Sequence, residues 1–591
     1  MKVTVSKSKS DEYFYICHSF INKNGKSTSK VVKRLGSLSE LSLKLGTDRD
    51  GVMRWAKEQA RSATEAFNAD NNIVSIPFSP NKLIEKDKQR TFNCGYLFSQ
   101  SILFSLHFDN ICRNIKERYK FDFNLKAIFS DLIYARLLHP SSKKSSFSFA
   151  NTLLERPEYD LQHVYRTLSI LSKESDYIQA EIYRNSNFLH KRNTKILYYD
   201  CTNYYFEIEQ ENGSKTYGKG KEHRPNPIIG MGLFMDADGF PLAFDLYPGK
   251  QNEQKSLNPL EQKVIRDFDC SEFIYCSDSG LGSQNNKLLN DMDGRSYVVT
   301  QSLKKLKKED REIALNPKQY RKIGSNKFID ISELDEDDPI IYNTVFYKEV
   351  PIESKKLSET MIVTYSPKYR AYQAKIRQGQ IERAMKMMAN GTKVKKNRKN
   401  PNDPARFIKK TAITSNGEVA EETICELDQK AIDDEAMYDG FYAVTTDIEG
   451  DVAEILKINE RRWQIEECFR IMKTDFEARP IYLQREDRIK AHFLICFLAL
   501  LVYRILAYKL NNQYTTEQII DTLKEMRVCE MEGYGYIPTY KRTDITDALH
   551  ELFGFRTDAQ IIKKAKMRKI IHQSKERNKL LYSDTKEKVQ E

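Results

Sequence analysis

Two aspartates and one glutamate lie in sequence surroundings that could bring acidic side chains together for catalysis. Asp200 interrupts the strand-like run KILYYDCTNYYFEI at residues 195–208, Asp278 ends the short apolar run EFIYCSD, and Glu466 lies in the charged stretch RRWQIEECFRIMK. Strands are poor in carboxylates, although a single Asp at a strand end usually caps a loop. Three carboxylates brought together repel one another unless divalent cations such as Mg²⁺ or Mn²⁺ neutralise them. Such a set predicts a two-metal site for in-line phosphoryl displacement.

The stretch around Glu466 has helical periodicity and crowds charge onto one helix face. Spacings of three, four and seven residues predict that one face carries Glu466, Phe469, Arg470 and Lys473, with Arg462 one turn earlier. One interpretation is a surface ladder of ion pairs. The other interpretation is that this helix packs against the sheet that bears the aspartates, because it precedes the deeply apolar run at residues 493–503. In that case Arg462 and Lys473 face phosphates.

The apolar side chains of the same helix are expected to point elsewhere and pack into a core: Trp463, Ile465, Cys468, Met472 and Phe476. Glu467 is the rival to Glu466 as the acidic residue of the site. Its spacing to Arg462 and Lys473 is the less favourable of the two, so Glu466 is preferred.

Charge along the chain points to a polyanionic partner. The 591 residues hold 95 Lys+Arg against 83 Asp+Glu, a formal net charge of +12. The excess clusters in residues 391–410 and 561–580, each with eight Lys/Arg and one acid. Such runs are either solvated loops or sites where DNA binds by releasing counterions. In the first run, the predicted DNA contacts are Lys395, Lys396, Arg398 and Lys399.

Cysteine usage and hydropathy predict an intracellular protein. The ten cysteines form no C-x-x-C pair, which argues against a zinc site and a disulfide framework. The start of the chain has no apolar signal region, and residues 493–503 are too short a run to span a membrane. We therefore expect a buried core helix at 493–503, no membrane partner and a cytoplasmic location, at the nucleoid when bound to DNA.

The elements predicted around the three acids form a mixed α/β fold with helices on a sheet. A hairpin is expected near the start, where two strand-like runs flank NKNGK, and a helical unit over 95–190. Three antiparallel strands follow, with DADG and Gly239 at a hairpin turn, and then a helix and two further strands. A capping box, TTEQ at 515–518, is predicted to open a C-terminal helix.

These elements divide the chain into six expected regions. They are an N-terminal hairpin-containing region (1–90), a helical DNA-binding region (91–190), the first part of the core (191–303), a β-rich insertion (304–444), the second part of the core (445–510) and a basic helical C-terminal region (511–591).

Taken in order, these motifs resemble the DDE transposases of bacterial insertion sequences. YYDCTNYYFE is similar to the family's first catalytic Asp on its first strand, and YCSDSGLGS to its Asp-x-Gly motif after the fourth strand. RRWQIEECFRIMK resembles the Tyr-x2-Arg-x3-Glu-x6-Lys signature of one branch, matched by Arg462, Glu466 and Lys473. The similarity covers about 195–300 and 445–510, and more loosely RLLHPSSK in the helical region.

The resemblance implies a fold, an activity and its partners. It implies a ribonuclease H-like core in which Asp200, Asp278 and Glu466 are catalytic and bind two Mg²⁺ ions, with Mn²⁺ as a substitute. The implied activity is cut-and-paste transposition: cleavage at terminal inverted repeats and strand transfer into target DNA by a synaptic homodimer. A DNA-binding protein that has lost catalysis, and a nuclease that hydrolyses without joining strands, are the alternatives.

Two departures from the family pattern and one further motif bear on DNA contacts. Asn459 stands where the signature has Tyr, so a phosphate contact is missing or another residue supplies it. Some relatives hold a flipped base on an inserted Trp, whereas this chain has only Trp55 and Trp463, both outside the insertion. His223 and Arg224, in KEHRPN, are further DNA-binding candidates; a loop histidine with a local partner is the other interpretation of His223.

Overall fold

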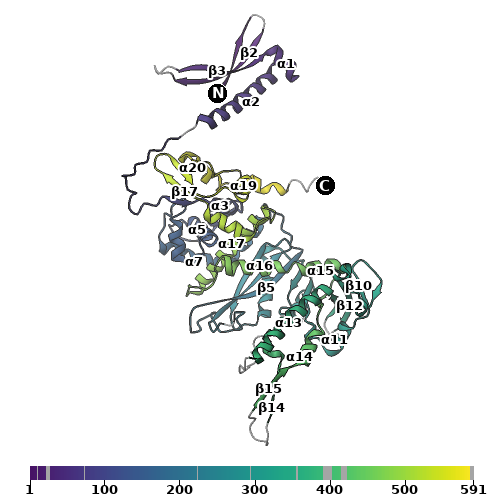
Figure 1. Ribbon diagram of the computed structural model, residues 1–591. Coiled ribbons are helices and arrows are strands. Elements are labelled where there is room, and N and C mark those ends of the chain that lie inside the picture. Colours follow the sequence, from purple (N-terminus) through teal and green to yellow (C-terminus); the bar gives the residue numbers. More distant parts are fainter. Residues whose placement is uncertain are drawn as a thin grey trace. The chain divides into compact units, whose positions relative to one another are not determined.

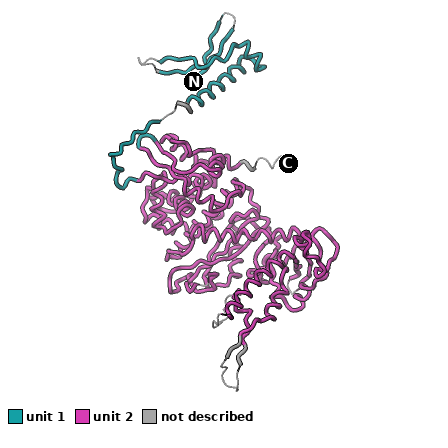
Figure 2. Tube along the Cα trace, viewed as in Figure 1, with its two compact units in different colours: residues 1–88, 532–534 teal, residues 89–531, 535–591 magenta. Residues whose placement is uncertain are grey.

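The computed structural model describes residues 1–8, 11–21, 27–71, 74–222, 224–292, 294–353, 357–389, 402–413 and 422–585. The chain divides into two compact units (Figure 2). The first comprises Met1–Lys88 with Glu532–Tyr534, and the second Gln89–Met531 with Gly535–Glu591.

The first unit is a three-stranded antiparallel sheet with two helices and its own apolar core. Its elements are β1 (Lys2–Lys7), β2 (Glu12–Ile21), β3 (Ser27–Ser37), α1 (Leu38–Leu45) and α2 (Arg49–Asn71). β2 and β3 pair in antiparallel register, which confirms the predicted hairpin. A capping box between Ser37 and Glu40 begins α1, and Gly46 ends it in the left-handed conformation. The core includes Phe14, Leu41 and Val52.

The second unit begins with a helical region, as the periodicity of 95–190 predicted (Figure 1). Its helices are α3 (Tyr96–Ser105), α4 (Phe108–Arg118), α5 (Leu125–Leu138), α6 (Lys143–Ala150), α7 (Leu161–Lys173) and α8 (Ser175–Ser186). They pack around α17 (Glu486–Lys509), which contains the apolar run 493–503. Within the described residues, α17 alone has the length and apolarity of a membrane span, and 89% of its most apolar window is buried inside the protein. The prediction of a buried core helix is confirmed.

A ten-stranded sheet forms the centre of the second unit. Its order is β11-β10-β12-β13-β16-β9-β8-β5-β6-β7. β5 pairs antiparallel with β6 and parallel with β8, and β8 pairs parallel with β9. The bounds of these strands are β5 (Ile196–Tyr205), β6 (Ile228–Asp236), β7 (Pro241–Pro248), β8 (Ile274–Ser277), β9 (Ser296–Thr300), β10 (Tyr320–Lys322), β11 (Phe328–Ile329), β12 (Phe346–Glu353), β13 (Ser358–Tyr365) and β16 (Phe441–Thr446). Gly239 turns β6 into β7 at a φ of 85°, as DADG predicted.

The two faces of the central strands pack into different cores. Tyr198 and Tyr204 of β5 lie in the main core, with residues of α16 (Trp463–Arg470) and α17. Tyr199 and Cys201 lie in a second core, with residues of α9 (Leu257–Phe268). Because side chains of a strand alternate between faces, this division fixes the direction of every residue of β5.

The segment expected as an insertion, 304–444, continues the same sheet. β16 pairs antiparallel with β9, and β13 and β12 follow in order. Helices and a separate two-stranded ribbon accompany them: α10 (Gln284–Leu289) before the segment, then α11 (Lys308–Leu315), α12 (Pro339–Tyr342), α13 (Pro367–Ala389), β14 (Ile408–Ile413), β15 (Glu422–Leu427), α14 (Gln429–Ala436) and α15 (Val452–Glu460) after it.

The C-terminal region packs onto the helical region in a second small sheet. β17 (Arg527–Met531) pairs with both β18 (Gly535–Pro538) and β4 (Thr91–Asn93). The other elements are α18 (Thr516–Glu525), α19 (Asp544–Phe553) and α20 (Lys564–Gln573). Thr515 and Gln518 form the predicted capping box of α18.

Candidate active site

Asp200 lies within β5, and Asp278 directly follows the neighbouring parallel strand β8. In the register of β5 and β8, Tyr198 is paired with Cys276. Each aspartate lies two residues beyond its member of that pair, and within β5 this spacing directs the Asp200 side chain to the same face as Tyr198. Tyr198 and Cys276 belong to the core that contains Ile465 of α16. Asp200 therefore points to the face on which the Glu466 helix lies, and Asp278 is close enough to raise the pKa of Asp200.

Burial and charge set the protonation of Asp200. Asp200 is only 7% exposed, and its carboxylate accepts a hydrogen bond from the Cys201 N–H at 2.7 Å. Burial raises the pKa of Asp200 to about 6, and Asp278 adds to the increase. Lys221 and Arg462 oppose it. The carboxylate thus sits beside a second acid and two cations, an environment suited to a divalent metal ion.

Asp278 is held at the start of a tight loop. Its Oδ1 accepts hydrogen bonds from the N–H groups of Gly280 at 3.0 Å and Leu281 at 3.1 Å. The Gln254 side chain donates to the Gly280 carbonyl at 3.0 Å. A Cβ atom at position 280 would lie 3.3 Å from Asp278 Oδ1, a tight contact that the glycine of the Asp-x-Gly motif avoids.

Arg462 links Glu466 to the two aspartates. Its Nη1 donates to Glu466 Oε1 at 2.7 Å. Burial lowers the pKa of Arg462, but the charges of Glu466, Tyr442, Asp200 and Asp278 together raise it above its usual value. One guanidinium is therefore within electrostatic range of all three acids. Glu467 instead pairs with Arg470, its Oε2 accepting from Nε at 2.7 Å.

The helix departs in two respects from the predicted faces. Trp463 is 60% exposed and does not pack into the core, because it occupies the first turn at the outer end of α16. After Arg470 the helix continues as a π-helical turn, η5 (Ile471–Asp475). The wider turn shifts Lys473 out of the regular 3.6-residue spacing and away from Arg470, whose partners are Glu467 and Asp475.

Lys473 nevertheless lies near Asp200. Its Nζ lies 5.6 Å from the centre of the Tyr204 ring, on β5. Burial and the neighbouring Lys221 lower the pKa of Lys473 to about 8, whereas Asp200 and Glu253 counteract the decrease. The structure thus places Lys473 beside Asp200, although not by the helical geometry that the spacing suggested.

The carboxylates of Asp200, Asp278 and Glu466 do not all lie within 4.8 Å of one another. Among described residues, three acidic or His/Cys ligand atoms lie within 4.8 Å of one another only in Asp547, His550 and Asp558. In that group the carboxylates are ion-paired to Arg556, and the His550 Nε2 accepts a hydrogen bond from the Thr557 N–H at 3.1 Å. It is therefore a charge-paired structural cluster. Arg462 instead connects Asp200, Asp278 and Glu466, and it forms an ion pair with Glu466.

Two charged residues that the sequence did not suggest complete the site. Lys221 donates from Nζ to the Cys201 carbonyl, and its N–H donates to Asn203 at 3.2 Å, which ties its loop to β5. Glu253 begins η1 (Glu253–Ser256), whose Ser256 hydroxyl lies 2.7 Å from the Tyr199 hydroxyl. Burial and Asp278 raise the pKa of Glu253, while Lys221 and Lys473 oppose the increase. Lys221 begins the motif KEHRPN, in which only His223 and Arg224 were proposed as DNA contacts, and nothing in the sequence around Glu253 distinguished that residue.

Asn459 is engaged by a tyrosine from another strand. Its Nδ2 donates to the Tyr442 hydroxyl at 2.9 Å, and its Oδ1 accepts from the Thr300 hydroxyl at 3.2 Å. Tyr442 lies on β16 and is among the groups that raise the pKa of Arg462. A phenol is therefore present beside Arg462, although the sequence position of the signature tyrosine holds Asn.

The other predicted DNA contacts are only partly described. Arg224 lies over the Tyr205 ring at 4.3 Å and is 3.6 Å from Glu222. His223 and the residues Lys395, Lys396, Arg398 and Lys399 lie outside the described residues.

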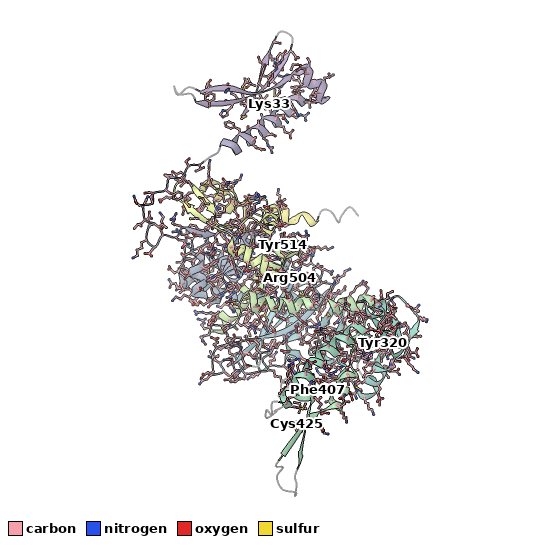
Figure 3. All side chains as sticks on the ribbon, viewed as in Figure 1. Lys33, Tyr320, Phe407, Cys425, Arg504 and Tyr514 are labelled. Atoms are coloured by element: carbon pink, nitrogen blue, oxygen red, sulfur yellow. The ribbon has the colours of Figure 1, made fainter. Side chains whose placement is uncertain are left out.

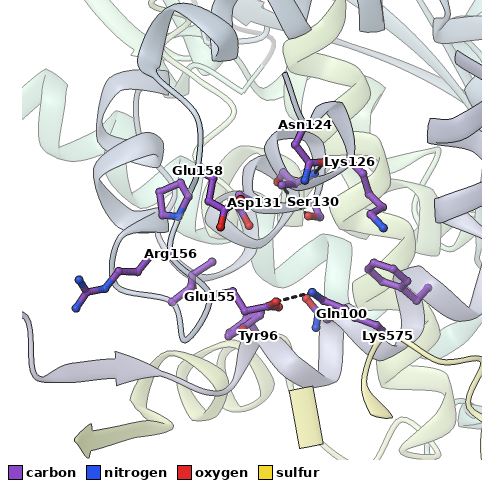
Figure 4. A pocket seen from close by; sticks show the side chains of 14 residues that line it. Tyr96, Gln100, Asn124, Lys126, Ser130, Asp131, Glu155, Arg156, Glu158 and Lys575 are labelled. Atoms are coloured by element: carbon purple, nitrogen blue, oxygen red, sulfur yellow. Dashed lines mark hydrogen bonds and ion pairs between the residues drawn. The ribbon is translucent and has the colours of Figure 1, made fainter. Parts of the chain in front are cut away.

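A cavity of about 410 Å³ lies apart from the aspartates, in the helical region (Figure 4). Its lining carries both charges in equal number, namely Lys126, Arg156 and Lys575 against Asp131, Glu155 and Glu158. Lys575 and Glu155 form an ion pair across it at 2.5 Å. This balance is unlike a phosphate-binding site, and the cavity is not part of the candidate active site.

Paired aspartates on a mixed sheet, beside basic side chains, are typical of metal-dependent phosphoryl-transfer enzymes. Residues 191–502, more than half of the 591, match the sequence model of the family described as Transposase DDE domain. The chain belongs to this family of DDE transposases, which are polynucleotidyl transferases and endonucleases that use divalent metal ions.

Comparison with other proteins adds little to this assignment. A cryo-EM structure of a piggyBac transposase synaptic complex with hairpin DNA is similar over 73% of this chain and 78% of that chain, at a TM-score of 0.34 and 9% identity. A similarity this low carries no argument. No curated protein sequence matches the chain.

Proposed function

We propose that this transposase moves an insertion sequence by cutting and pasting DNA, with Asp200, Asp278 and Glu466 as its catalytic acids. The observation that carries the proposal is the position of Asp200 on β5 and of Asp278 just after the paired strand β8, together with one arginine that interacts with all three acids. The strand arrangement supports a ribonuclease H-like core: three antiparallel strands, then two parallel ones. The Arg, Glu and Lys of the signature branch are all present beside these aspartates.

The residues fit a pair of Mg²⁺ ions. Carboxylate oxygens are the ligands that Mg²⁺ prefers, with Mn²⁺ as a substitute, and Asp200 is buried beside a second acid. Bound divalent cations would supply activation of the attacking oxygen and stabilisation of the leaving oxygen. Glu466 has to exchange its Arg462 partner for this role. Glu253 adds a fourth carboxylate close to Asp278.

The basic residues of the site bind and orient the DNA. Once Glu466 turns to the metal site, the Arg462 guanidinium is released to contact a phosphate, for which its fork of donors is suited. Lys473 and Lys221 lie near Asp200 and neutralise charge on the same strand. Tyr442 offers its hydroxyl in place of the tyrosine that the signature has at position 459. Arg224 extends the contacts along the loop.

The partners follow from the reaction. Duplex DNA at the terminal inverted repeats is cut to expose a 3′-hydroxyl, and this hydroxyl attacks target DNA at the same site. The helical region 91–190 and the basic runs 391–410 and 561–580 hold the ends. Two chains bring two ends together, at the nucleoid in the cytoplasm.

Replacement of Asp278 by Asn tests the proposal, because it preserves the shape of the side chain and removes its charge. We expect Mg²⁺-dependent cleavage of an end-containing duplex to fall about a thousandfold, equivalent to roughly 4 kcal/mol, while affinity for the duplex is retained. The matched control is Asp245→Asn. Asp245 is paired with Gly232 in the same sheet, and its charge acts on Lys263 of α9, on the opposite face.

Three outcomes would contradict the proposal or part of it. Undiminished cleavage by the Asp278→Asn protein would remove this site from the reaction. Binding by the wild-type protein without any nicking would favour a transposase-derived DNA-binding protein. Nicking without strand transfer would favour a nuclease.

A further inference from the structure

The hairpin of the first unit extends as a two-stranded ribbon beyond its sheet. β2 and β3 are paired from Tyr13 and Ser37 to Ile21 and Ser27. β1 pairs only with residues 12–17 of β2. From His18 onward the two strands therefore continue without a third (Figure 1).

Positive charge in this unit is concentrated on the ribbon. From Tyr13 to Ser39 the sequence holds five Lys/Arg and no acid, whereas residues 40–71 hold five Lys/Arg and six acids. The ribbon, taken as the whole β2–β3 pair, has three described cations. Lys30 is paired with His18 in the two-stranded part, whereas Lys33 and Arg34 are paired with Ile16 and Tyr15, where β1 also lies beside β2. The segment with the two helices, residues 40–71, is thus nearly neutral, and the excess of positive charge lies in the sequence before it.

The cations of the ribbon are available to a partner. β3 is an edge strand, and every residue from Ser27 to Arg34 is exposed. Within the described part of the chain, Lys30 and Lys33 form no ion pair, and Arg34 stacks over the Tyr13 ring at 4.9 Å. Figure 3 marks Lys33 on this unit. Val31 and Val32 are 55% and 50% exposed, so the strand also presents apolar surface.

Protection of an edge strand against aggregation also uses lysine, but it does not account for all of these features. Edge protection does not need an acid-free ribbon, a guanidinium stacked on an aromatic ring, or two exposed valines between the lysines. A two-stranded ribbon of this kind fits the major groove of B-DNA, where cations contact phosphates and apolar atoms contact thymine methyl groups.

We propose that the β2–β3 ribbon is a binding site for duplex DNA, in which Lys30, Lys33 and Arg34 contact phosphates. The inference rests on the proposed function insofar as the bound duplex is the end or target DNA of transposition. It adds a site in the first unit, outside residues 191–502. The ribbon contributes affinity, and the site at Asp200 contributes chemistry.

The experiment compares two full-length double variants with the same change of charge. Lys30→Glu/Lys33→Glu alters the ribbon, and Arg54→Glu/Lys57→Glu alters exposed positions of α2. The probes are a labelled duplex from the end of the element and an unrelated duplex of equal length, titrated by fluorescence anisotropy at several salt concentrations. Thermal unfolding shows whether both variants fold.

We expect the ribbon variant to bind either duplex at least about tenfold more weakly, with a salt dependence of log K reduced by about 2, since two phosphate contacts are lost. The α2 variant should stay within about twofold of wild type. Equal losses in the two variants, or a loss confined to single-stranded DNA, would overturn the inference. At saturating end duplex the ribbon variant should still cleave. A wild-type protein that binds but never cleaves would contradict the proposed function without contradicting the ribbon site.

Discussion

At the residue scale, neighbouring charges determine what each side chain of the site can do. Asp200 has its pKa raised to about 6 by burial and by Asp278, so at neutral pH it is ionised but readily protonated in mild acid. Arg462 lies between the acids and holds Glu466 at 2.7 Å. The acids and Arg462 therefore neutralise one another in the free protein. Bound metal ions and DNA phosphates would replace these internal ion pairs.

The charge of Lys473 predicts that DNA binding depends on pH. Its pKa is lowered to about 8, so the side chain is a cation below that pH and loses its charge as the pH rises through it. Arginine keeps its charge throughout this range. We expect the affinity of the free wild-type protein for end duplex to decline as the pH rises through about 8, and the affinity of Lys473→Arg to decline less.

Anisotropy titrations across this pH range measure the difference. Lys490→Arg, a change of the same kind on α17, serves as the control. Parallel pH profiles for wild type and Lys473→Arg would show that Lys473 does not contact the DNA.

At the element scale, a buried ion pair fixes the turn between β6 and β7. Arg192 donates from Nε to Asp236 Oδ2, and both side chains are almost fully buried, at 1% and 0% exposure. The other oxygen of Asp236 accepts from the Phe240 N–H at 2.9 Å and the Asp238 N–H at 3.1 Å. The turn carries Gly239, whose carbonyl accepts from Arg504 of α17 at 2.8 Å.

Replacement of Asp236 by Asn should therefore destabilise the second unit. The change leaves the Arg192 guanidinium buried without a counter-charge, which typically costs about 3–5 kcal/mol. Denaturant unfolding should show an earlier transition for this variant, and little change for Asp245→Asn, whose carboxylate is less buried. A free energy of unfolding within about 1 kcal/mol of wild type would mean that water or another group replaces the lost charge.

At the scale of the whole molecule, distant regions converge behind the candidate active site. Arg136 of α5 is buried and donates to the Phe476 carbonyl at 2.8 Å and the Glu477 carbonyl at 3.3 Å, just after the π-helical turn that carries Lys473. The helical region thereby supports the end of the Glu466 helix. This contact gives RLLHPSSK, near the start of the second unit, a structural role at the site.

Each chain carries one set of Asp200, Asp278 and Glu466, and an element has two ends to be cut. We therefore expect the complex with end duplex and Mg²⁺ to contain two chains and two duplexes. Light scattering or mass photometry of the assembled complex measures this stoichiometry, with Asp278→Asn protein used to prevent turnover. A complex with one chain that still cuts both ends would contradict the prediction.

Local patterns determined a large part of this protein. The N-terminal hairpin, the β6–β7 turn at Gly239, the capping box at Thr515 and the buried helix at 493–503 all follow from spacing and turn chemistry within short segments. The two aspartates could be selected for the same reason, because each interrupts or ends an apolar strand. Periodicities of 2 and 3.6 residues and the preferences of caps and turns act over a few residues, so they are legible in the sequence.

Only the tertiary structure decided which residues meet at the site. The parallel register of β5 and β8 sets Asp200 beside Asp278, and the π-helical turn rather than regular helical spacing directs Lys473. Lys221, Glu253 and Tyr442 come from a loop, a short helix and a distant strand that no local pattern connects. Their proximity depends on how separate elements pack. The free energy of that packing comes from contacts throughout the core and is not a property of any one segment.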